Sequence, residues 1–203
     1  MLHLLALVGI LTISFSAVFV RMAEVSPVTA AFYRAAYAIP ALSLIWARAG
    51  AVERRSSRAR ALAMASGLLL ALDLALWHRA IVLIGVGLAT VIANIQVVFV
   101  AVLAWALYGD RVTGRTMAIV AAVLGGLALT SGLSRPDAYG ANPVLGTLLG
   151  AGAGACYAGF LLTFRAANRK LAPSAGPLLD STIGTAAGAL LLAPFDPGFA
   201  FTI

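Results

Sequence analysis

The stretch LATVIANIQVVFVAVLAWALYGDRVTGR, residues 88–115, decides the fold of this chain. Its first 21 residues carry no charge, and two arginines, Arg111 and Arg115, lie in the seven residues that follow. About 20 apolar residues in a helix match the ~30 Å hydrocarbon core of a bilayer. The stretch therefore predicts one membrane crossing that ends in a short basic connection.

The same pattern extends outward in both directions. Of the 203 residues, 62% are hydrophobic and 10% are charged, whereas soluble domains are nearer half apolar and a quarter charged. Apolar stretches nearly use up the chain, so no soluble domain of ordinary size fits. We predict an all-α integral membrane protein, a polytopic bundle with seven transmembrane helices. The stretches run roughly 4–20, 28–47, 61–78, 86–107, 116–133, 144–164 and 174–195.

The positive charges alternate between the gaps that separate these stretches. The first, third and fifth gaps hold only Arg21, Arg79 and Arg135. Cytoplasmic loops of membrane proteins retain Lys and Arg, which predicts a multi-pass protein of the cytoplasmic (inner) membrane with its N-terminus in the cytoplasm. The second, fourth and sixth gaps hold the other loop cations: Arg48, Arg54, Arg55, Arg58, Arg60, Arg111, Arg115, Arg165, Arg169 and Lys170.

Topology also accounts for the net charge of +7. We expect anionic lipid headgroups, not nucleic acid, as its counter-charge. The basic run over 48–60 is interpreted as a solvated loop beside lipid phosphates. No Lys or Arg precedes the first apolar stretch, so we expect a retained first helix and not a cleaved secretory signal.

The sequence has few residues that could bind a metal ion or a cofactor. It has a single cysteine, Cys156, and two histidines, His3 and His78, with no metal-ligand spacing and no phosphate-binding P-loop. We expect no catalytic residues, no metal and no cofactor, and therefore no enzyme. The expected partners are a small-molecule substrate and the bilayer, and a homodimer is compatible with the sequence.

Glycines are spaced for close helix contact. Gly146, Gly150 and Gly154 are four residues apart, as are Gly184 and Gly188. Small residues at this spacing let helices approach closely in lipid. We favour interface packing for them, with a glycine-lined substrate path as the alternative.

Several segments together resemble the EamA-like group of the drug/metabolite transporter superfamily. They are Ser26-Pro27 ahead of a helix that holds Arg34, the stretch over 89–115, and GGLALTSGL over 125–133. Asp110-Arg111 stands where the family usually has Glu-Arg. Val97 stands near a position where the family often has Pro, so we expect a straighter helix there.

The resemblance implies two inverted repeats of five helices, ten in all. It assigns 1–135 to the first repeat and 144–203 to an incomplete second repeat with only its first two helices, so we expect a longer parent protein. A faint internal repeat agrees: Pro27 matches Pro173 and Arg34 matches Asp180 at one offset of 146. These two crossings run in opposite directions, as inverted repeats of secondary transporters do.

Polar side chains inside the apolar stretches are candidates for a site, because a charge at membrane depth costs roughly 2.5–3.5 kcal/mol. At about 1.5 Å per residue, Arg34 and Asn94 lie about 9 Å, and Gln96 and Asp73 about 12 Å, below the outer boundary. We predict one layer in which Arg34 and Asp73 form an ion pair facing the interior. Asn94 is favoured over Gln96, because the two point about 200° apart. A purely structural salt bridge is the alternative.

Three further residues are weaker candidates. His78 lies close to the outer boundary beside Trp77, where interfacial anchoring is favoured over a proton relay. Tyr157 either faces a cavity or packs against a neighbour. Asp180 lies about 9 Å from the cytoplasmic boundary and mirrors Arg34 in the faint repeat.

These residues predict a secondary transporter, an exporter or exchanger of small organic metabolites that works by alternating access. Asp73 or His78 could couple transport to protons. A non-transporting membrane scaffold or assembly subunit is the alternative, and a lipid-modifying membrane enzyme is a further one.

Overall fold

A computed structural model describes residues 7, 11, 25–48, 55–110, 112–130, 142–168 and 175–201. Every regular element within these ranges is helical, which confirms the all-α prediction. The elements are α2 (Pro27–Arg48), α3 (Ser57–Ile84), α4 (Val86–Ala93), α5 (Gln96–Tyr108), α6 (Gly114–Thr130), α7 (Pro143–Ala167), α8 (Ala175–Leu192) and the short 3-10 helix η2 (Ala193–Phe195).

The helices follow the predicted crossings closely. Both α2 and α7 begin and end within three residues of the predicted stretches 28–47 and 144–164, and α3 is longer than predicted at both ends. Five helical segments of the described chain are long and apolar enough to cross a membrane, with α4 and α5 together making one of them. The predicted first crossing, 4–20, lies outside the described residues apart from Leu7 and Leu11.

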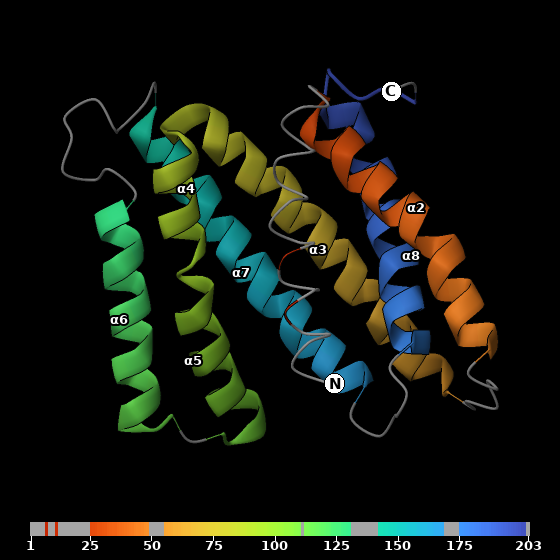
Figure 1. Cartoon of the computed structure of the whole chain (residues 1–203), viewed down its shortest axis with the longest axis horizontal. Helices are drawn as coiled ribbons and strands as arrows, with labels where there is room; N and C mark the ends of the chain where they lie inside the picture. Colours follow the sequence, from red (N-terminus) through yellow and green to blue (C-terminus); the bar gives the residue numbers. More distant parts are fainter. Residues whose placement is uncertain are drawn as a thin grey trace.

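Successive spans alternate in direction, and α3 and α7 lie side by side through the middle of the bundle (Figure 1). Helices α2 and α8 lie together on one side of this pair, and α4, α5 and α6 lie on the other. The alternation brings the cations of the described chain mostly to one end, which we call the basic end. Its residues are Arg48, Arg55, Arg58, Arg60, Arg115 and Arg165.

The helix starts are set by short polar caps. The Ser26 hydroxyl accepts from the Thr29 N–H at 3.2 Å, and Pro27 begins α2 as predicted. Ser56 caps α3 and Asn142 caps α7 in the same way, with Pro143 as the first residue of α7. A side-chain oxygen at this position satisfies one N–H that has no partner inside the helix, and Pro at the first turn loses no bond.

Glycines bring α3 and α8 into backbone contact. A Cβ on Gly67 would overlap the carbonyl oxygen of Ser181, and a Cβ on Gly184 would overlap the carbonyl oxygen of Met64. Between these contacts the hydroxyls of Ser66 and Ser181 share a buried hydrogen bond of 3.0 Å. The packing interpretation of the spaced glycines is therefore confirmed for Gly184, and Gly146, Gly150 and Gly154 of α7 likewise meet side chains or backbone of α3 and α4.

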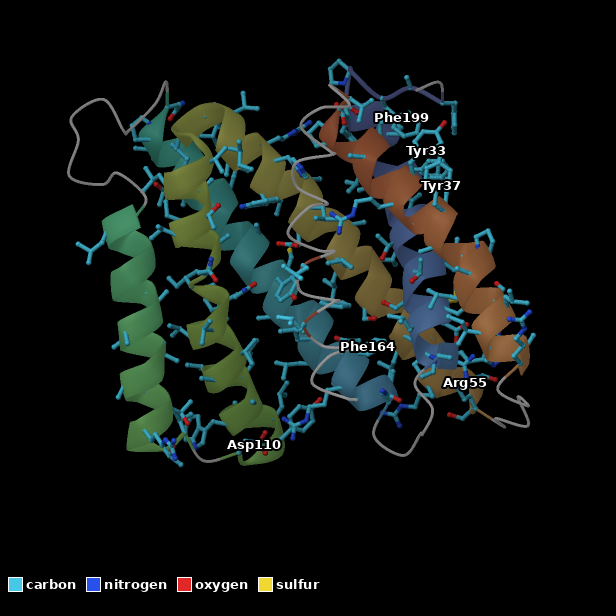
Figure 2. The ribbon with its side chains drawn as sticks, in the orientation of Figure 1. Tyr33, Tyr37, Arg55, Asp110, Phe164 and Phe199 are labelled. Carbon is cyan, nitrogen blue, oxygen red and sulfur yellow. The ribbon has the colours of Figure 1, made fainter. Side chains whose placement is uncertain are left out.

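The segment after α8 folds back over the start of α2. The Val28 N–H donates to the Asp196 carboxylate at 3.1 Å, and the Tyr33 hydroxyl donates to the Phe201 carbonyl. Phe199 packs edge-on against Phe32, with ring centroids 6.2 Å apart. Figure 2 shows Tyr33, Tyr37 and Phe199 gathered at the end opposite the basic end. The segment after α8 thus covers the start of α2 with aromatic rings.

Candidate functional site

A single face of α3 lies along α7 through the middle of the bundle. Leu76 comes within 3.5 Å of the Cβ position of Gly152, and Leu69 within 3.3 Å of that of Gly159. Asp73 is four residues after Leu69 and three before Leu76, so it shares their face of the helix. We call this line of contact between α3 and α7 the seam. Asp73 therefore lies on the seam opposite the α7 residues between Gly152 and Gly159.

The α7 residues at that level are Cys156 and Tyr157, and both interact electrostatically with the Asp73 carboxylate. All three side chains are half-buried. The Tyr157 ring packs against Phe160, with centroids 5.4 Å apart. The expected packing of Tyr157 against a neighbour is therefore present, and a role in a cavity stays a prediction.

The carboxylate of Asp73 has no hydrogen bond or ion pair with any residue that the structure describes. The other three described carboxylates are all engaged: Asp110 by Arg165, Asp180 by Arg55 and Arg60, and Asp196 by backbone N–H groups. Asp73 is the one that also lies in the middle of a membrane-spanning helix. It is therefore the described acid best placed to meet a ligand within the membrane.

The fourth predicted crossing is interrupted near this seam. Helix α4 ends at Ala93 and α5 begins at Gln96, and the Ile95 N–H bonds back only three residues, to Ile92, at 3.0 Å. The Asn94 side-chain amide donates to the Thr90 carbonyl at 2.7 Å. The prediction of a straighter helix near Val97 is therefore wrong, since a local side-chain bond of this kind competes with the helical ladder.

Gly154 of α7 makes room for this interruption. A Cβ there would lie 2.7 Å from the Ala93 carbonyl oxygen and 3.2 Å from the Gln96 nitrogen. Irregular backbone at membrane depth is tolerated only where protein or a water-filled cavity covers it. Since Gly154 is three residues before Tyr157, the interruption and Asp73 meet α7 at neighbouring levels. The backbone between Asn94 and Gln96 thus lies against α7 at a level next to Asp73, and the polar layer itself stays a prediction.

Arg34 does not join this group. Its side chain is exposed on α2, and α2 packs against α8 and against α3 on the side away from α4 and α5. The ion pair expected between Arg34 and Asp73 is not among those formed within the described chain. The depth estimate was compatible with the pair, but Asp73 faces α7.

His78 lies near the end opposite the basic end. Its Nδ1 donates to the Leu74 carbonyl at 2.7 Å, and its ring packs edge-on against Trp77 at 5.1 Å. It interacts electrostatically with Arg34 and Asp196. These contacts fit the favoured interpretation of an interfacial residue.

Asp180 has a partner that the sequence analysis missed. It forms an ion pair with Arg55, and both side chains are 6% exposed, while the Arg60 Nε lies 3.7 Å from the same oxygen. The interpretation of the whole basic run over 48–60 as a solvated loop is therefore wrong for Arg55. A lone acid near the cytoplasmic boundary needs a cation, but the sequence offers several on that side, and Arg169 and Lys170 are closer to Asp180 in sequence than Arg55 is.

An exposed ion pair lies elsewhere at the basic end. Asp110 pairs with Arg165, both side chains being 46% exposed, and the Arg165 guanidinium lies 4.6 Å from the centroid of the Tyr108 ring. Figure 2 shows Asp110 and Arg55 at the same end of the molecule. The acid that stands at the family's Glu position therefore ties the α5–α6 connection to the end of α7.

Within the described ranges no group of three His, Cys, Asp or Glu side chains is placed to hold a metal ion. What the described part of the seam offers is one carboxylate, the rings of Tyr157 and Phe160, and an interrupted helix.

Comparison with known proteins gives one match. The model of the EamA-like transporter family matches residues 1–132, which is more than half of the chain. No curated protein and no solved structure matches the chain significantly.

Proposed function

The chain belongs to the EamA-like transporter family, and from this premise we propose that it is a secondary transporter of small organic metabolites, an exporter or exchanger, in the cytoplasmic membrane. The family and the apolar helices make it a multi-pass membrane protein of a transporter family. The mechanism that we propose is alternating access to a site at the α3–α7 seam.

The observation that carries this proposal is the Asp73 carboxylate, which has no hydrogen bond or ion pair with any described residue. An ionisable side chain in a membrane-spanning helix is costly, and such residues commonly mark a substrate or ion pathway. The interrupted α4–α5 span beside it adds support, because transporters often build their sites from discontinuous helices near the middle of the membrane.

The proposed architecture is the ten-helix inverted repeat, with 1–135 as the first repeat and 144–203 as the start of the second. The opposite directions of α2 and α8 (Figure 1) are those that an inverted pair requires. We place the basic end in the cytoplasm, following the retention of Lys and Arg on that side.

Transport by the full-length protein in proteoliposomes tests the proposal. Vesicles loaded with an unlabelled metabolite mixture are assayed for counterflow of labelled amines, sugars, amino acids and organic acids. We expect flux of at least one compound, reduced about tenfold or more by Asp73→Asn and retained by the control Asp110→Asn, whose ion pair is exposed.

Other outcomes are informative as well. Retained flux in Arg34→Ala would remove Arg34 from the site and leave Asp73 in it. The absence of flux for every class of compound would contradict a transporter and favour the membrane scaffold.

A further inference from the structure

Asp73 occupies the polar position in an otherwise apolar contact stripe. Leu69, Leu76 and Ala80 of α3 all meet glycines of α7, at Gly159, Gly152 and Gly150. Asp73 continues this stripe at helical spacing, yet no glycine is closely packed against it, and its neighbours Cys156 and Tyr157 are half-buried. The carboxylate thus stands between close α3–α7 contacts, at a level where α7 presents Cys156 and Tyr157.

The charge balance around this position is negative. Among the described residues, the cations lie elsewhere: Arg55, Arg60 and Arg165 contact acids at the basic end, and Arg79 donates to the Phe195 carbonyl at the opposite end. The facing ends of α4 and α5 carry opposite partial charges at the interruption, so they largely cancel. Within the described chain, Asp73 is therefore the acid at this level of the seam, and no described cation contacts it.

We infer that the seam beside Asp73 and Tyr157 binds a positively charged nitrogen group, an ammonium or guanidinium, of the transported substrate. This inference rests on the proposed function and adds the chemical class of the substrate. The carboxylate oxygens accept charge-assisted hydrogen bonds from such a group.

The aromatic rings near Asp73 also favour a positively charged substrate. A cation gains from the face of a tyrosine ring within about 6 Å, most of all where water is excluded. Tyr157 and Phe160 together place two rings on α7 next to the level of Asp73. An anionic substrate would meet the unpaired carboxylate with no described cation to offset it, and would be repelled.

Binding measurements with matched compounds test the inference. The purified full-length protein is challenged with triplets that share one carbon skeleton and end in an amine, a hydroxyl or a carboxylate, such as phenethylamine, phenylethanol and phenylacetate. Polyamine, guanidino and short aliphatic skeletons widen the set. Thermal stabilisation reports binding, and proteoliposome counterflow reports transport.

We expect the amine or guanidino members to bind and be transported in preference to their partners. Asp73→Asn should weaken their apparent affinity by at least about tenfold, Asp73→Glu should retain part of it, and Asp110→Asn should leave it unchanged. Size-exclusion profiles matching the wild type show that the variants are folded.

Two results would overturn the inference while leaving the proposed function standing. In one, hydroxyl or carboxylate members are transported as well as the amines, with no effect of Asp73→Asn. In the other, Asp73→Asn leaves substrate affinity intact and abolishes only accumulation driven by a pH gradient, so that the carboxylate carries a proton. Lack of binding and flux for every member would remove the proposed function and this inference together.

Discussion

Arg55 and Asp180 form a buried ion pair that joins the start of α3 to the first half of α8, 125 residues away in the sequence. It lies on the basic-end side of the glycine contacts that bring the two helices together. Because those backbones are in direct contact, the pair fixes the register of one α3–α8 unit. We therefore expect α3 and α8 to move together in any change of access.

The first prediction concerns the loss of one partner of this pair. Arg55→Ala removes the buried partner of the Asp180 carboxylate and leaves only the more distant, exposed Arg60; loss of a buried partner typically costs about 3–5 kcal/mol. Arg60→Ala is the matched control, because its side chain is 62% exposed and 3.7 Å from the same carboxylate, and exposed pairs contribute at most about 1 kcal/mol. Thermal unfolding of the purified protein measures both. Equal effects of the two variants would contradict a structural role for the buried pair.

The second prediction concerns the close approach of α3 and α8. Gly184→Ala places a methyl group against the Met64 carbonyl, where backbone would have to shift, so we expect a marked drop in the unfolding temperature. Gly125→Ala in α6 is the control, since nothing lies within 4 Å of its Cβ position and Ala favours a helix over Gly by about 1 kcal/mol. The two substitutions should therefore differ in sign. A neutral Gly184→Ala would show that the helices separate easily.

Hydropathy and charge predicted the five described spans, because both are properties of a stretch and not of a helix face. They did not reveal the interruption at Asn94, because two amides, Asn94 and Gln96, leave the stretch apolar on average. They placed Arg34 and Asp73 at compatible depths, but depth does not tell which neighbour a side chain faces. The partner of Asp180 was hidden because the loop rule predicts exposed arginines, and Arg55 is buried.

The third prediction concerns the interruption between α4 and α5. Gly154→Ala brings a methyl group to 2.7 Å from the Ala93 carbonyl oxygen, whereas Gly152→Ala meets only the tip of Leu76 at an ordinary 3.5 Å. We expect Gly154→Ala to reduce both stability and transport, because α4 and α5 must move away from α7, and Gly152→Ala to be tolerated. The unfolding temperature and the counterflow rate are measured for both variants. The interruption would be unimportant for function if Gly154→Ala lowered stability and left the flux per folded molecule unchanged.

The last prediction concerns the orientation of the bundle. Arg58 is exposed at the basic end, and Val86 is exposed at the opposite end as the first residue of α4. In a Cys156→Ala background, Arg58→Cys should react with a membrane-impermeant maleimide only in inside-out vesicles, and Val86→Cys only in intact cells, since retained cations mark the cytoplasmic side. Both positions lie at helix ends, so neither substitution disturbs the α3–α7 seam. The reverse labelling pattern would show that the basic end faces outward and would contradict the proposed orientation.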